Sequence, residues 1–144
     1  GSTKTNGGLN MTDEIARKAD RICDVLYNKK AEDILKIYIG DKSILADYFV
    51  VCTGRNTQQV KALCDELEEK LIPEGLIPKR KEGYQECRWI VVDYGDILVH
   101  IFHPDERVYY NLERLWTDGT NTVNFSALRD RELEEAQRAA QSQN

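Results

Sequence analysis

The sequence predicts a single α/β (α+β) domain in which helices flank a mixed sheet of about five strands. Segments with the apolar periodicity of helices alternate along the chain with short apolar runs typical of strands. The length of 144 residues is that of one ordinary domain with its own hydrophobic core. No internal repeat is present, so the elements are expected to build one sheet.

Three segments are expected along the chain. Residues 1–10 are rich in Gly, Ser, Thr and Asn and look like the remnant of an expression tag, with Met11 as the native start. Residues 11–118 are expected to form the domain. Residues 119–144 are expected to form a C-terminal extension that is partly helical or disordered, because few large apolar residues follow residue 128.

The domain opens with a predicted helix and two strands. Residues 12–27 carry an apolar stripe at helical spacing behind Thr12, which is a good N-cap residue. Residues 31–39 are predicted to form a strand that ends in a Gly-Asp turn. Residues 47–53 form an almost continuous apolar run, which is typical of a strand covered on both faces.

A second helix follows, and it is long enough to cross from one parallel strand to another. Its cap is either Asn56 or Thr57, and it ends before Pro73. One apolar stripe runs along it, at helical spacing. Residues 77–80 are predicted to form a short edge strand.

A hairpin and a short helix complete the predicted domain. Residues 87–92 and 97–102 are two strands joined by a tight turn in which Gly95 supplies the positive φ. Pro104 opens a short helix. We expect its apolar residues to lie on one side: Val108, Leu112, Leu115 and Trp116.

The composition excludes several classes of protein. The formal net charge is −5, which argues against a basic nucleic-acid footprint and favours a basic partner. No apolar run approaches the roughly 18 residues of a membrane span, so the cytoplasm is the expected compartment. The cysteines form no C-x-x-C pair and are expected to be reduced and buried: Cys23, Cys52, Cys64 and Cys87.

No catalytic residue, metal or cofactor is predicted. Gly54 precedes a helix, where phosphates often bind, but no glycine-rich phosphate motif surrounds it. His100 and His103 are three positions apart on or beside a strand, which places them on opposite faces and disfavours a shared metal. Asp93 and Asp96 could divide acid and base roles, but acids are also ordinary turn residues, and we favour the turn role.

Aromatic residues interleaved with acids in the second half indicate an interface. Aromatic side chains supply much of the binding energy at protein interfaces, and acids suit a basic partner protein. Because strand residues alternate between faces, Trp89, Val91 and Asp93 share one side of their strand. A face that carries both Trp89 and Asp93 is not a plain core face.

Residues 31–116 resemble the ribosomal silencing factor family, also called Iojap or RsfS. The order and spacing of five pieces carry the resemblance: KAEDI at 30–34, ADYFVVCTG at 46–54, QQV at 58–60, WIVVDYGDILVHIF at 89–102 and RVYYNLERLW at 107–116.

The resemblance implies both a fold and a function. The fold would be similar to that of nucleotidyltransferases but without their catalytic motif, since Arg55 follows Gly54 where those enzymes have Ser. Members of the family bind the large ribosomal subunit through the ribosomal protein numbered fourteen. Bound there, they block association with the small subunit and repress translation under nutrient limitation, and free members are commonly homodimers.

The resemblance and the face alternation together suggest residues for ribosomal contact. Trp89 would be an aromatic anchor, the acids would pair with basic residues, and the others would form hydrogen bonds. The predicted residues are Trp89, Asp93, Asp96 and His100, with Asp47, Tyr48 and Glu113 as weaker candidates. Two alternatives remain open, a biogenesis factor of the large subunit and a nucleotidyltransferase-like enzyme.

Overall fold

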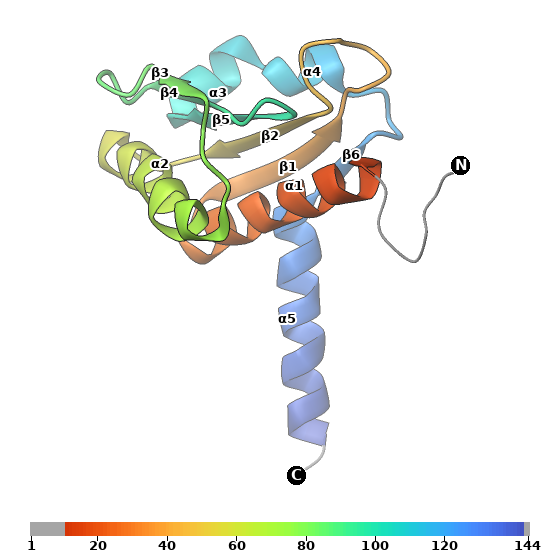
Figure 1. Cartoon of the computed structure of the whole chain (residues 1–144). Coiled ribbons are helices and arrows are strands. Elements are labelled where there is room, and N and C mark those ends of the chain that lie inside the picture. The colour runs from red at the N-terminus through yellow and green to blue at the C-terminus, as the bar shows by residue number, and fades with distance from the viewer. Residues whose placement is uncertain (1–10, 143–144) are drawn as a thin grey trace.

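A six-stranded mixed sheet forms the centre of the protein (Figure 1). The computed structural model describes residues 11–142, so the expectation of a tag remnant at residues 1–10 lies outside the described part. The helices and strands are, in chain order, α1 (Met11–Asn28), β1 (Glu32–Tyr38), β2 (Tyr48–Thr53), α2 (Thr57–Leu71), the short 3-10 helix η1 (Ile72–Glu74), β3 (Arg80–Glu82), β4 (Trp89–Asp93), β5 (Ile97–Phe102), α3 (Pro104–Tyr110), α4 (Leu112–Trp116), β6 (Thr122–Asn124) and α5 (Phe125–Ser142).

The strands lie in the order β3-β4-β5-β2-β1-β6. The central strands β2 and β5 are parallel, with Tyr48 opposite Ile97 and Thr53 opposite Phe102, and the other neighbours are antiparallel. Residues 49–53 of β2 are all buried. The predicted mixed sheet and the strand covered on both faces are therefore confirmed.

One face of the sheet is covered by α1 and α2, which lie below the sheet in Figure 1. Asn56 is the cap of α2, because its Oδ1 accepts a hydrogen bond from the Gln59 N–H at 2.8 Å. The fully buried side chains of this core include Ile22 and Leu26 of α1, Leu63 and Leu67 of α2, and Val50, Val99 and Ile101 of the sheet.

Three of the four cysteines are buried in this core, as predicted. Cys23, Cys52 and Cys64 are buried and unpaired, whereas the expected burial of Cys87 was wrong, because Cys87 lies in the loop before β4 and is partly exposed. Burial disfavours the charged thiolate and raises the pKa of Cys52 and of Cys64 to about 12. These two thiols therefore stay protonated at neutral pH.

The chain after residue 118 extends both the sheet and its core. Strand β6 pairs with the outer edge of β1, and the Ser126 hydroxyl accepts a hydrogen bond from the Ile34 N–H at 2.9 Å. Phe125 is buried against Tyr27, with ring centroids 6.3 Å apart. From residue 130 onward α5 is exposed on all sides and projects from the domain in Figure 1.

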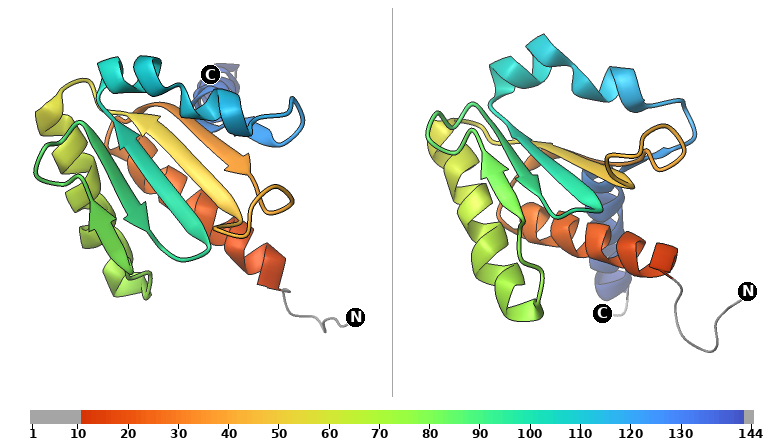
Figure 2. Two further views of the ribbon diagram at one scale, coloured as in Figure 1. Left: turned by 90° about the horizontal axis from the view of Figure 1, so that it is seen from above. Right: turned by 45° about the horizontal axis from the view of Figure 1, so that its top comes forward.

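The opposite face of the sheet carries a layer of aromatic side chains. The Trp89 ring stacks on Phe102 at 4.9 Å and lies 4.7 Å from the ring of Tyr110 on α3. Phe49 meets Trp116 of α4 edge to face at 5.3 Å. Helices α3 and α4 are thereby held across one end of this face (Figure 2).

His100 lies in the middle of this aromatic layer and is only 5% exposed. The Trp89 indole Nε1–H donates a hydrogen bond to its Nδ1 at 3.1 Å, so the ring is neutral with its proton on Nε2. Its nearest ring is that of Phe49, at 4.7 Å. Because these neighbours offer no compensating charge, burial lowers the pKa of His100 to about 4.

Three details differ from the sequence-based expectations. The sheet has six strands rather than five, because β6 was not predicted from a segment in which only Val123 is a large apolar residue. Strand β3 begins at Arg80, where the predicted strand ended. The helix predicted from Pro104 to Trp116 is broken at Asn111, which has a φ of 47°.

The break at Asn111 changes which side chains are buried. Leu112 and Trp116 pack against the sheet, whereas Val108 and Leu115 are 79% and 76% exposed. The expectation that these four residues form one apolar side was therefore wrong, because two short helices at different angles replace one continuous helix.

We predict that Phe125→Ala lowers the free energy of unfolding by about 3 kcal/mol, because a buried aromatic ring leaves a cavity when it is truncated. Leu133→Ala is the matched control on the exposed part of α5, where Leu133 is 51% exposed, and it should change stability little. Chemical denaturation of both variants measures this difference. Equal stability of the two would show that the start of α5 contributes nothing to the core.

We also predict that the protein loses stability in acid through His100. The unfolded chain binds a proton at His100 near the ordinary pKa of about 6.5, but the folded protein does so only near pH 4. The free energy of unfolding should therefore fall by up to about 3 kcal/mol from this residue as the pH drops from 6.5 to 4. Denaturation at a series of pH values gives the free energy of unfolding of wild type and of His100→Gln. The difference between the two proteins should shrink as the pH falls from 6.5 to 4. A difference that stays constant over this interval would contradict the assignment.

Candidate functional site

Part of the aromatic face is left uncovered by helices. In the left view of Figure 2, α3 and α4 cross one end of the sheet while the strands at the other end remain visible. A shallow groove lies on this uncovered part. We call it the open groove, and its lining residues are Leu45, Arg80, Glu82, Val91, Asp93 and Leu98.

The register of the sheet explains why these side chains come together. Asp93 of β4 lies opposite Leu98 of β5 and opposite Arg80 of β3, while Glu82 lies opposite Val91. Paired residues on neighbouring strands point to the same face, and so do residues two apart on one strand. The prediction that Trp89, Val91 and Asp93 share one side is consistent with this register.

The loop between β1 and β2 forms one wall of the open groove. Ile44 is fully exposed and Leu45 is 69% exposed, whereas the next residue, Ala46, is buried. Leu45 lines the groove together with the half-buried Val91 and Leu98, which gives the groove an apolar part, and Ile44 adds a second exposed apolar side chain on the same loop. Contiguous apolar surface of this kind is typical of a binding site.

Asp93 is fixed at the end of the groove by the hairpin turn. One carboxylate oxygen accepts a hydrogen bond from the Gly95 N–H at 2.7 Å, and the other lies 3.4 Å from Nε of Arg80. Gly95 has a φ of 90°, which confirms the predicted positive φ at this turn. Asp93 therefore both stabilises the turn and presents negative charge to the groove.

Two other predicted acids lie at the same end of the sheet. The Asp96 carbonyl accepts hydrogen bonds from the backbone N–H groups of Asp47 and Tyr48, at 2.8 and 3.2 Å. Asp47 and Asp96 are partly exposed. Together with Glu82 and Asp93, these acids outnumber the neighbouring Arg80, which lies 3.9 Å from Glu82 and 3.4 Å from Asp93, and so give this end of the sheet a net acidic character.

The remaining predicted residues lie elsewhere and contact other parts of the chain. Tyr48 packs against the core on the covered face. Glu113 accepts a hydrogen bond from Nε of Arg107 at 3.1 Å, and Arg107 in turn donates to the Thr53 hydroxyl. These contacts fasten the start of α4 to the end of β2.

Trp89 and His100 stand between the open groove and the helices above it. Trp89 is half-buried by its stacking partners, and His100 is buried. Asp93 thus lines the groove and Asp96 and Asp47 lie at the same end of the sheet, whereas Trp89 and His100 lie toward the other end, where α3 and α4 cover the sheet.

Sequence reasoning missed two apolar residues of the groove, Leu45 and Leu98, and the exposed Ile44 that precedes Leu45 on the loop. One signal was available in the sequence. Ile44 and Leu45 are adjacent large apolar residues between a predicted turn and a predicted strand, where they have no core position to occupy. The place of Leu45 beside Leu98 depends on the pairing of β2 with β5 and has no local signal.

The groove is suited to binding a complementary surface. Within residues 11–142, no group of three or more His, Cys, Asp and Glu residues is arranged to hold a metal ion. Among the described helices, none combines the length and the apolar character that crossing a membrane requires. An apolar floor with an acidic edge fits a partner that offers apolar and basic groups.

Comparison with known proteins identifies the family. Residues 12–144 match the family described as "Ribosomal silencing factor during starvation". The chain is 45% identical to Ribosomal silencing factor RsfS of Bacillus subtilis over 104 residues, which cover 72% of this chain and 86% of that protein. It is 32% identical over 101 residues to the mouse protein named Mitochondrial assembly of ribosomal large subunit protein 1, covering 68% of this chain and 44% of the mouse protein.

A solved structure shares the fold. A crystal structure of a protein from Bacillus halodurans superimposes with a TM-score of 0.66 at 38% sequence identity, covering 75% of this chain and 97% of that one. The match in sequence over nearly the whole described chain and the match in fold lead to one conclusion. The chain belongs to the ribosomal silencing factor family, as the resemblance in its sequence indicated.

Proposed function

We propose that this protein docks on the large ribosomal subunit through its open groove and blocks association with the small subunit. The contact would be made with a basic surface of the ribosomal protein numbered fourteen, and the result would be repression of translation under nutrient limitation. One observation carries the proposal: part of a sheet face is left apolar, uncovered and edged with acids in a member of this family.

Burial of the apolar area would supply most of the favourable binding free energy. Ile44 and Leu45 are exposed in the free protein, and burying one such side chain contributes roughly 1.5–3 kcal/mol. Val91 and Leu98 belong to paired strands, so the floor of the groove loses little conformational entropy when it is covered. Leu45 would form the centre of the contact, with Val91 and Leu98 as its floor and Ile44 as an adjoining contact on the loop.

The acidic side chains would orient the basic partner and speed its association with the groove. Glu82 and Asp93 line the groove, and Asp47 and Asp96 lie at the same end of the sheet. Charges at the rim of an interface mainly steer association and exclude wrong partners. A basic ribosomal protein is a partner of the complementary charge.

Two of the predicted residues, His100 and Glu113, would act by holding neighbouring side chains in position. His100 accepts the hydrogen bond of the Trp89 indole, which fixes the ring beside the groove. Glu113 holds Arg107 and the start of α4. We therefore assign Trp89 a place at the edge of the contact, and His100 and Glu113 the role of holding the edge in position.

We infer that the free protein forms a homodimer in the cytoplasm. Val108, Tyr109 and Leu115 of α3 and α4 are each more than three-quarters exposed, which offers apolar surface outside the open groove. Sedimentation equilibrium of wild type and Tyr109→Ser measures this state. A monomer at micromolar concentration in both would contradict the inference.

A second candidate function is assistance in the assembly of the large subunit. The name of the mouse relative, Mitochondrial assembly of ribosomal large subunit protein 1, favours it. Both functions would use the same docking surface. Deletion of the gene separates them, since an assembly factor leaves incomplete large subunits and a silencing factor leaves complete ones.

We predict that the double variant Leu45→Ser with Asp93→Asn binds large subunits at least about tenfold more weakly than wild type, because it loses an apolar contact and a charge. The asparagine side chain retains an oxygen that can accept the Gly95 N–H, so the fold should persist. Co-sedimentation with purified large subunits measures the affinity.

The matched control is Leu133→Ser with Glu134→Gln, which removes one apolar and one acidic side chain from the exposed part of α5. It should bind like wild type. Equal affinity of both double variants would contradict the assignment of the groove.

We further predict that added monovalent salt weakens binding of the wild type, because salt screens charge pairs at an interface rim. At constant magnesium, the variant Asp93→Asn with Asp96→Asn should show a smaller dependence on salt than wild type. A wild-type affinity that does not change with salt would argue for an apolar interface alone.

A further inference from the structure

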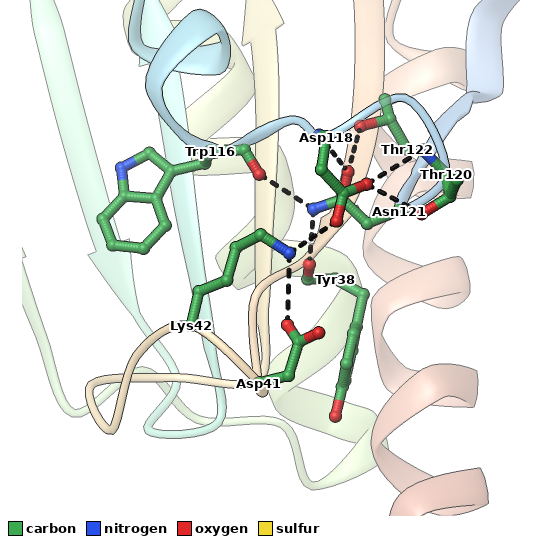
Figure 3. Close-up of polar contacts among 8 residues, drawn as sticks. All are labelled: Tyr38, Asp41, Lys42, Trp116, Asp118, Thr120, Asn121 and Thr122. Carbon is green, nitrogen blue, oxygen red and sulfur yellow. Dashed lines mark hydrogen bonds and ion pairs between the residues drawn. The ribbon is translucent and has the colours of Figure 1, made fainter.

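The loop that carries Ile44 and Leu45 is fastened to a distant part of the chain. Figure 3 shows the Lys42 ammonium group between two carboxylates, those of Asp41 and Asp118. The Lys42 Nζ donates to Asp118 at 2.6 Å and lies 3.4 Å from Asp41. Asp118 belongs to the segment between α4 and β6, 76 residues further along the chain.

Asp118 is itself held in place by hydrogen bonds. The carboxylate accepts from the backbone N–H and the hydroxyl of Thr120, at 2.9 and 2.8 Å. The hydrogen bonds from Lys42 and Thr120 hold the pKa of Asp118 well below its usual range. The carboxylate therefore stays charged at any pH at which ribosomes are studied.

Asn121 attaches the same segment to the sheet. Its side-chain amide donates to the backbone carbonyls of Tyr38 and Trp116, both at 2.8 Å, and its Oδ1 accepts from the Asp118 N–H at 2.9 Å (Figure 3). The backbone carbonyl of Asn121 also accepts from the Tyr38 N–H at 2.9 Å. Asp118 is therefore a fixed anchor point relative to β1.

The loop depends on few contacts of its own. Its base is closed by a hydrogen bond from the Ile39 N–H to the Asp47 carbonyl at 2.8 Å, and a turn joins Lys42 and Ser43 back to Ile39. Within residues 43–46, the Leu45 N–H donates to the Ser43 hydroxyl at 3.0 Å. Since Ile44 and Leu45 are exposed, packing does not restrain the tip.

We propose that Asp118 is a positioning residue for ribosome docking: through Lys42 it holds the loop tip so that Leu45 faces the open groove before the partner arrives. This proposal rests on the function proposed above. A loop ordered in advance loses less conformational entropy when it binds, which increases affinity without any new contact. Asp118 and Lys42 need not touch the partner.

The pair is exposed enough that its effect on global stability is expected to be small. The Lys42 and Asp118 side chains are 30% and 39% exposed, and ion pairs of this kind contribute little to unfolding free energy. A positioning role therefore predicts changes in local order and in affinity without a change in melting temperature.

The test is Lys42→Met, which keeps an unbranched side chain only one atom shorter and removes its charge. We expect amide hydrogen exchange at residues 43–46 to accelerate at least several-fold and the affinity for purified large subunits to fall about five- to tenfold, with an unchanged melting temperature. Lys42→Arg retains the charge and should restore most of both properties. Asp118→Ala should reproduce the exchange phenotype of Lys42→Met.

The control for loss of a surface charge is Arg21→Met. It breaks the ion pair between Arg21 and Glu74, which has a distance of 2.7 Å and similar exposure but lies on α1 and η1. It should leave exchange in the loop and affinity for the large subunit as in wild type. An equal loss of affinity in Arg21→Met and Lys42→Met would overturn the proposal in favour of an effect of net charge.

A double-mutant cycle shows whether the effect acts through Leu45. In a Leu45→Ser background, Lys42→Met should weaken binding by less than twofold, because the positioned side chain is already absent. A full additional loss there would overturn the proposal and make Lys42 a direct contact. Unchanged exchange at residues 43–46 in Lys42→Met would overturn it as well.

The exchange measurement also separates this proposal from the function on which it rests. If wild-type protein fails to bind large subunits, the proposed function is wrong, and exchange in Lys42→Met alone decides whether Asp118 orders the loop. If wild type binds and Lys42→Met binds equally well, the function stands and the positioning role is wrong.

Discussion

The parallel pairing of β2 with β5 is the constraint on which the rest of the structure depends. These two strands lie at the centre of the sheet, and each carries one antiparallel partner that extends the sheet outward. Their pairing sets Asp47 beside Asp96 and so places the loop after β1 next to the hairpin of β4 and β5. The open groove combines residues from both halves, including Leu45 and Leu98, and it exists only while this central ladder is in register.

The two faces of the sheet are covered to different extents. On one face α1 and α2 bury a continuous apolar core, and the fold gains most of its stability there. On the other face the aromatic layer holds α3 and α4 over one end only, and the apolar residues at the other end remain in contact with water. Because these residues stay exposed, they do not stabilise the free protein. Exposed apolar residues of this kind are typical of a surface that a partner covers. The charged anchor at Asp118 adds no packing, and its proposed effect is on the loop beside this uncovered end.

Patterns that are local in the sequence predicted most of the fold. The apolar run of β2, the alternation in β4 and the helical stripe of α2 each correspond to an observed element. Strand β6 was missed because three residues hold little signal, and its position comes from hydrogen bonds to β1 far away in the chain. The same distinction applies to the site. Alternation placed Trp89 and Asp93 on one face, but it could not show that α3 and neighbouring aromatic rings bury His100, nor that a loop brings Leu45 to that face.

The most direct test of this account is the joining of ribosomal subunits in the presence of the protein. Purified large subunits are saturated with it, small subunits are added, and light scattering follows the formation of complete ribosomes. Joining should fall in proportion to the fraction of large subunits occupied, as measured by sedimentation of the same mixture. Complete ribosomes that form at the normal rate and to the normal extent, on large subunits shown to carry the protein, would contradict it.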